Sequence, residues 1–289
     1  MERKRHRIFD HPILSYFILF LIAQIFISLG GSIDNLLAGF IPGYAAEVTA
    51  MGKTQMSASG IGVAIGAMVA VGLFTLWFRK EFRGMLGFKG MRTAVLMLLP
   101  VLVLHWIGSV ASWVQFGTAS VFIAFLRAFA PGFGEEIAFR GLGVANYMRT
   151  IKSEKQITVI FWLSSVFFGL VHITNAFVGA DPIMAVIQAL YAIGIGLLLG
   201  AVFLRTGLLW PIILGHMSLD FMEFIRADMG SSGGIMVNFG VGDWITIAAG
   251  VLGAVVGIYL MRKKNYPEIM ELWRNKWNKN EAETPEVID

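Results

Sequence analysis

Two adjacent glutamates and an arginine lie in one apolar stretch, where their types and spacing suit acid–base chemistry. Glu135, Glu136 and Arg140 occur in the run APGFGEEIAFR, residues 130–140. On a helix, Glu136 and Arg140 are four residues apart and can pair, whereas Glu135 is rotated by about 100°. This spacing predicts one carboxylate neutralised by the arginine and one left as a general base. A salt bridge that only ties helices together would explain the pair but would give Glu135 no role.

Two later segments add imidazoles and a further carboxylate. His172 follows Phe168 by four residues, and His216 precedes Asp220 by four, so the members of each pair share a helix face. A His–Asp pair can bind metal, orient a water or shuttle a proton. The alternatives are a packing histidine at 172 and an interhelical hydrogen-bond pair at 216 and 220. Together, these groups and the glutamates are those needed to activate a water.

The sequence lacks the residues that several other kinds of hydrolytic enzyme use. The chain contains no cysteine, which excludes a cysteine nucleophile, a thiolate metal site and lipidation of its own cysteines. It also contains no His-Glu-x-x-His run, the zinc-protease helix signature.

The elements that carry these residues are predicted to be transmembrane helices. The chain of 289 residues is 56% hydrophobic and 15% charged, against roughly 25% charged residues in soluble domains, and its mean hydropathy is +0.70. A span needs about 20 apolar residues. Eight such stretches are predicted, at about 12–37, 57–78, 93–115, 119–148, 157–178, 183–204, 207–226 and 243–262.

The basic residues predict the orientation of these spans. Every alternate connection is rich in Lys and Arg, whereas the others contain only Lys53. Since cytoplasmic loops are enriched in Lys and Arg, the pattern predicts an all-α, multi-pass protein of the cell membrane with both termini cytoplasmic. The first span reads as an uncleaved signal-anchor. The net charge of +4 is explained by these basic loops and needs no nucleic-acid partner.

The chain is divided into a transmembrane domain, 1–262, and a cytoplasmic tail, 263–289. In the tail, Trp273 and Trp277 fall on one helical face with basic residues nearby, which predicts a short helix on the membrane surface with tryptophans at the headgroups. The acidic final stretch is expected to be disordered. Within the domain, Pro131, Gly132 and Gly134 are expected to loosen the helix before the glutamates.

The polar motifs resemble those of the CAAX-protease and bacteriocin-processing (CPBP or Abi) family of intramembrane proteases. The resemblance covers about 119–225 and includes the sequences Phe139-Arg-Gly, Gly169-Leu-Val-His and Arg205-Thr-Gly-Leu-Leu-Trp-Pro around the motifs. The three motifs, in chain order, are Glu135-Glu136-x-x-x-Arg140, Phe168-x-x-x-His172 and His216-x-x-x-Asp220.

This resemblance implies an eight-helix intramembrane endopeptidase that hydrolyses a peptide bond of a membrane-associated peptide or protein. Glu135 would be the general base and His172 would help to hold the water, with Glu136, Arg140 and Phe168 in support. His216 and residue 220 would stabilise the oxyanion. If a divalent metal such as zinc is present, its ligands would be Glu135, His172, His216 and Asp220.

Position 220 is Asn or Asp in the resembled family, and the two side chains differ in chemistry. Asn can donate a hydrogen bond to an oxyanion, but an ionised Asp only accepts. We therefore expect Asp220 to orient His216, as carboxylates do in other histidine sites.

Two other functions are compatible with these residues. One is a non-catalytic bacteriocin-immunity or scaffold protein of the same fold. The other is a proton-coupled transporter, because Glu, His and Asp in spans also form proton relays. A transporter commonly shows an internal repeat, and none is evident between 12–115 and 119–262. The expected partners are the lipid bilayer and a membrane-associated substrate, and the sequence does not define the oligomeric state.

Overall fold

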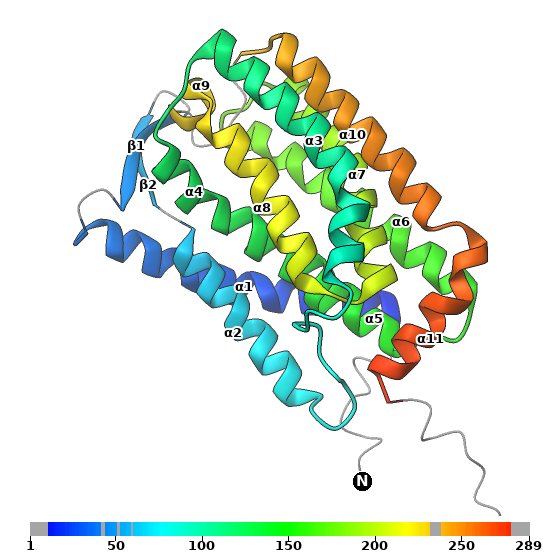
Figure 1. Cartoon of the computed structure of the whole chain (residues 1–289). Coiled ribbons are helices and arrows are strands. Elements are labelled where there is room, and N and C mark those ends of the chain that lie inside the picture. The colour runs from blue at the N-terminus through cyan, green and yellow to red at the C-terminus, as the bar shows by residue number, and fades with distance from the viewer. Residues whose placement is uncertain (1–10, 42–43, 51–52, 59, 232–237, 279–289) are drawn as a thin grey trace, which may run out of the picture.

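A computed structural model describes residues 11–41, 44–50, 53–58, 60–231 and 238–278. These residues form a bundle of helices, as predicted, together with one short antiparallel hairpin (Figure 1). The hairpin pairs β1 (Ala45–Ala50) with β2 (Lys53–Ala58) and lies in the connection between the first two predicted spans. The helices are α1 (Pro12–Ala38), α2 (Ile61–Trp77), α3 (Met91–Phe116), α4 (Val121–Phe129), α5 (Ala145–Arg149), α6 (Glu154–Val171), α7 (Pro182–Thr206), α8 (Leu209–Ile225), α9 (Ala227–Ser231), α10 (Val241–Leu260) and α11 (Tyr266–Lys276).

Short non-α stretches connect several of these helices. Two π-helical stretches, Ala130–Glu135 and Ile137–Val144, join α4 to α5 without a break. Two 3-10 turns, His172–Val178 and Lys263–Asn265, follow α6 and α10.

Five of the described helices are long and apolar enough to cross a bilayer. They are Pro12–Ala38, Met91–Phe116, Glu154–Phe177, Pro182–Thr206 and Val241–Leu260, and the shorter apolar helix Ile61–Trp77 accompanies them. The prediction of a helical membrane protein is therefore confirmed. The number of eight crossings and the cytoplasmic placement of both termini stay predictions.

Helices α6 and α8 carry the later polar motifs, and their packing places these motifs inside the bundle. Helix α10 packs against α3 and α7, α7 also packs against α6, and α8 packs against α3 and α4. Helix α1 covers α2 and the second π-helical stretch. Large apolar side chains that point outward, such as Leu21, Val114 and Leu190, suit contact with lipid rather than water.

The helix that carries the glutamates is widened between residues 130 and 144. Pro131 cannot donate a backbone hydrogen bond, and π-helical turns often occur at functional sites. A Cβ atom added to Gly132 would lie 2.7 Å from Cβ of Met217. The missing side chain therefore allows the widened helix to approach α8 next to His216.

Helix α11 packs on protein, so the prediction of membrane-surface tryptophans is wrong. Trp273 and Trp277 are 0% and 3% exposed. Their indole N–H groups donate to the carbonyl oxygens of Leu204 and Ala145, at 2.9 and 3.0 Å. Amphipathicity cannot distinguish a lipid surface from a protein surface, because both favour an apolar stripe. The predicted disordered stretch, 279–289, lies outside the described residues.

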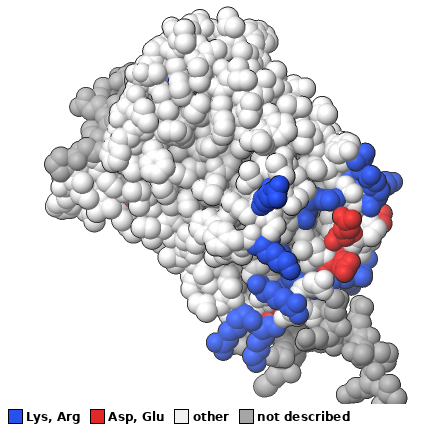
Figure 2. All heavy atoms as spheres, in the orientation of Figure 1, with Lys and Arg blue, Asp and Glu red and all other residues white. Residues whose placement is uncertain are grey.

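Basic side chains gather at the end of the bundle where α11 lies, as Figure 2 shows. This end includes the connection between α2 and α3, and the predicted basic N-terminus lies outside the described residues. Exposed members of this basic set include Arg79, Lys80, Arg83, Lys89, Lys263 and Lys264.

Candidate active site

Glu136 is the centre of a buried polar network. Its side chain is fully buried, and its Oε1 accepts hydrogen bonds from Nη1 of Arg140 at 3.0 Å and Nδ1 of His216 at 2.9 Å. The Glu136–Arg140 pair expected from the sequence is therefore present. His216 is a second partner, 80 residues away along the chain.

Arg140 connects this network to α6 and α7. Its second terminal nitrogen, Nη2, donates to the carbonyl oxygen of Gly196 at 3.1 Å. Its guanidinium carbon lies 4.4 Å from the centre of the Phe168 ring, a favourable cation–π position. Phe168 thus supports the arginine by direct contact.

His216 lies between two carboxylates. Its Nε2 is 3.0 Å from Oδ2 of Asp220, while its Nδ1 faces Glu136. The contact with Asp220 has the distance of an ion pair but not the alignment of a hydrogen bond, since Oδ2 makes no hydrogen bond. Because ionised carboxylates only accept, the arrangement fits a doubly protonated imidazolium.

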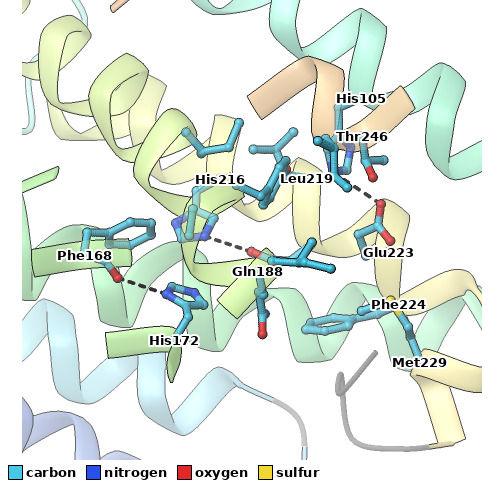
Figure 3. A pocket seen from close by; sticks show the side chains of 16 residues that line it. His105, Phe168, His172, Gln188, His216, Leu219, Glu223, Phe224, Met229 and Thr246 are labelled. Atoms are coloured by element: carbon cyan, nitrogen blue, oxygen red, sulfur yellow. Dashed lines mark hydrogen bonds and ion pairs between the residues drawn. The ribbon is translucent and has the colours of Figure 1, made fainter. Parts of the chain in front are cut away.

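The ring of His172 is held in one tautomer. Its Nδ1 lies 2.9 Å from the carbonyl oxygen of Phe168, and a carbonyl only accepts, so Nδ1 carries the proton and Nε2 carries the lone pair. The Phe168 ring contacts both imidazoles, with centroids 5.2 Å from His172 and 5.6 Å from His216. Figure 3 shows the three rings side by side.

Glu135 has no hydrogen-bond partner among the described residues. Its Oε2 is buried and unpartnered, although the carboxylate lies within electrostatic range of His172, His216 and Asp220. Native proteins pair the great majority of buried polar atoms because an unpaired one is costly. A carboxylate with an unpaired oxygen in electrostatic range of two imidazoles suits the role of a general base.

A cavity of about 90 Å³ lies beside these groups. His172, His216 and Asp220 line it in common with His105 and Glu223, and Figure 3 shows the three histidines and Glu223 around it. Its volume is enough for several waters, since one water needs about 10–15 Å³ of such space. Glu135 is not among the lining residues; it lies at the end of the first π-helical stretch, within electrostatic range of the same imidazoles.

The described residues, as they stand, form no cluster that would hold a zinc ion. Zinc enzymes usually supply three protein ligands, and the described residues contain no group of three or more His, Asp or Glu arranged to hold a metal. Oε2 of Glu135, Oε2 of Glu136 and Oδ2 of Asp220 make no hydrogen bond, but together with Nε2 of His172 they do not form such a group.

His105, Ser109 and Glu223 form a second polar cluster that sequence reasoning missed. Oε1 of Glu223 accepts from the Ser109 hydroxyl at 2.7 Å and lies 3.3 Å from Nε2 of His105. The signal for Glu223 was present, because positions 216, 220 and 223 follow one face of a helix. The signal for Ser109 was only its spacing of four residues from His105.

The fold and site define a helical membrane protein with a buried glutamate, histidine and aspartate centre. Residues 115–222 match the family model for the Rce1-like type II CAAX prenyl endopeptidases. This match confirms the resemblance to the CAAX-protease family and supports a CAAX-type intramembrane protease. It covers all seven site residues predicted from the motifs and ends one residue before Glu223. No curated protein and no solved structure matches the chain.

Proposed function

We propose that the chain is a multi-pass endopeptidase of the cell membrane that cleaves a membrane-associated peptide or protein. Eight spans with both termini cytoplasmic are supported by the helices found at all eight predicted stretches. The gathering of basic residues at one end of the bundle (Figure 2) supports the same orientation, because cytoplasmic surfaces are enriched in Lys and Arg.

In the proposed reaction, Glu135 removes a proton from a water molecule while Nε2 of His172 accepts a hydrogen bond from it. The water oxygen attacks the carbonyl carbon of the peptide, and the carbonyl oxygen becomes an oxyanion. Protonated Glu135 then delivers the proton to the amide nitrogen as the carbon–nitrogen bond breaks. The products are a carboxyl group and an amine.

His216 is the proposed source of positive charge near the oxyanion. Glu136 and Asp220 contact its two ring nitrogens, and they would keep the imidazole protonated and oriented. Arg140 then balances the charge of Glu136, which gives the network one cation for each of these two carboxylates. Preorganised charge of this kind typically contributes about 10²–10³ in rate.

The observation that carries this proposal is the unpaired Oε2 of Glu135, in a carboxylate within electrostatic range of two imidazoles. Its test is cleavage of a membrane-proximal peptide library by the purified protein in lipid nanodiscs. Glu135→Gln and His172→Ala are compared with the wild type, and Glu271→Gln, on the exposed face of α11, is the matched control. Cleavage that is lost in the first two variants and kept in the control supports the protease.

The same experiment separates the two other functions. An immunity or scaffold protein would cleave nothing, and its effect on the host would persist in Glu135→Gln. A proton-coupled transporter would also cleave nothing, but Glu135→Gln would abolish proton-driven uptake in proteoliposomes. Either result would overturn the proposed endopeptidase.

A further inference from the structure

The cavity carries a second carboxylate, Glu223, held by residues of a different helix. His105 and Ser109 are each 1% exposed and lie one turn apart on α3, and both contact Oε1 of Glu223. The Glu223 side chain is 15% exposed and lines the cavity. Its other oxygen, Oε2, makes no hydrogen bond to the described residues. One oxygen is therefore fixed by α3 while the other is open to a ligand.

The charges that line the cavity favour a cationic ligand. Among the described lining residues, Asp220 and Glu223 are the carboxylates, and neither Lys nor Arg is present. Asp220 faces His216, whereas Glu223 makes no ion pair with a Lys or Arg among the described residues, and a cationic influence on it comes from Arg226, outside the cavity lining. Burying an ionised carboxylate is costly without a cation, and a cationic ligand that donates to the open oxygen would form a charge-assisted hydrogen bond.

The spacing along α8 relates Glu223 to the proposed reaction centre. Seven residues separate His216 from Glu223, a rise of about 10 Å along a helix. An extended peptide covers about 3.3 Å per residue. A substrate side chain near Glu223 would therefore lie within about three residues of the scissile bond beside His216. Ile187 and Leu219 form part of the apolar lining of the cavity. An apolar lining suits the methylene groups of a long basic side chain.

We propose that Glu223 binds a basic side chain of the substrate, so that the protein selects peptides with Lys or Arg within about three residues of the cleaved bond. Ser109 and His105 act as positioning residues that hold the carboxylate. This inference rests on the proposed function, since it names the substrate class of the same site.

Binding measured without hydrolysis tests the inference directly. Nanodiscs carrying Glu135→Gln protein are titrated with paired fluorescent peptides that contain either lysine or norleucine at one position on either side of the scissile bond. We expect the best lysine peptide to bind at least about tenfold more tightly, as a charge-assisted hydrogen bond allows. The double variant Glu135→Gln/Glu223→Gln should lose this preference, and Glu135→Gln/Glu271→Gln should keep it.

Cleavage by the otherwise wild-type protein gives a second measure. The ratio of kcat/KM for lysine over norleucine peptides should fall about tenfold in Glu223→Gln, and the ratio cancels any general loss of activity. Glu223→Asp retains the charge and should keep most of the preference. It is therefore the control that distinguishes loss of the charge from misfolding of Glu223→Gln. Equal binding of the two peptides, or a preference that survives Glu223→Gln, would overturn the inference.

The two proposals fail in different ways. Binding that depends on Glu223 in a protein that cleaves no peptide would eliminate the protease and leave the basic-residue pocket. Cleavage without a lysine preference would eliminate the pocket and leave the protease.

Discussion

Nδ1 of His216 lies 2.9 Å from Oε1 of Glu136, the same oxygen that accepts from Arg140 at 3.0 Å. One oxygen thus joins the first motif to the third. Glu136 is held by two donors, whereas its neighbour Glu135 is held by none. The two adjacent glutamates therefore differ in their contacts, and we expect substitutions to separate stability from catalysis.

Replacing Glu136 should destabilise the fold as well as reduce activity. Glu136→Ala leaves Arg140 buried and unpaired, and removing one partner of a buried ion pair typically costs about 3–5 kcal/mol. Thermal unfolding of the purified protein in detergent should show a lower midpoint. An unchanged midpoint would show that the network does not stabilise the fold.

Replacing Glu135 should reduce activity without destabilising the fold. Glu135→Gln removes the proposed base, and we expect the cleavage rate to fall by about 10²–10⁴. The midpoint of thermal unfolding should stay the same or rise, because a buried carboxylate without a partner is lost. A variant that keeps its rate contradicts the role of Glu135 as the base.

Replacing Asp220 distinguishes orientation from donation. If Asp220 orients and charges His216 through the 3.0 Å contact, Asp220→Asn should lower kcat/KM by about tenfold or more while leaving unfolding little changed. If residue 220 instead donates to the oxyanion, the Asn variant should be as active as the wild type or more active. Steady-state kinetics on one peptide decides between the two roles.

Replacing a tryptophan of α11 should test how this helix is held. Trp277→Ala removes a side chain that is 3% exposed and the hydrogen bond to Ala145, so we expect a loss of about 3–5 kcal/mol. Trp244→Ala is the matched control, because Trp244 is 65% exposed. Equal midpoints of thermal unfolding for the two variants would show that α11 is bound only loosely.

Lys276 should make stability depend on pH. Burial lowers the pKa of Lys276 to about 8 from 10.5, and its Nζ donates to the carbonyl oxygen of Gly84 at 2.8 Å. Between these two pKa values the unfolded chain binds more protons than the folded one, so stability should rise with pH. Below about pH 8 both states are protonated and the contribution of Lys276 is constant.

The Lys276→Met variant isolates this effect. The unfolding midpoint of the wild type, relative to that of the variant, should increase between pH 8 and pH 10. Parallel pH profiles for the two proteins would contradict the lowered pKa.

The local pairs of the site could be predicted from the sequence, because helical periodicity fixes them. Glu136 with Arg140 and His216 with Asp220 are each four residues apart and meet as expected. The contact between Glu136 and His216 depends on the packing of two distant helices, which periodicity does not encode. For the same reason, the contact of Glu223 with α3 could not be predicted from the sequence.

The fold could be predicted at the level of its helices. All eight apolar stretches are helical, since hydrophobic length is a strong signal. The hairpin in the first connection was missed because its two strands are short and rich in alanine, a residue that is depleted in strands. The direction of Trp273 and Trp277 was misjudged because their burial depends on tertiary contacts.

The packing of α11 against earlier helices has a consequence for the synthesis of the protein. Its tryptophans donate to carbonyl groups on helices that leave the ribosome earlier, and Trp277 stacks on Phe82 in the connection between α2 and α3. The contacts that join the early and late thirds of the polypeptide at this end therefore form only after residue 277 has been synthesised. A ribosome that stops at about residue 262 would release a chain with its long apolar helices complete and this junction open.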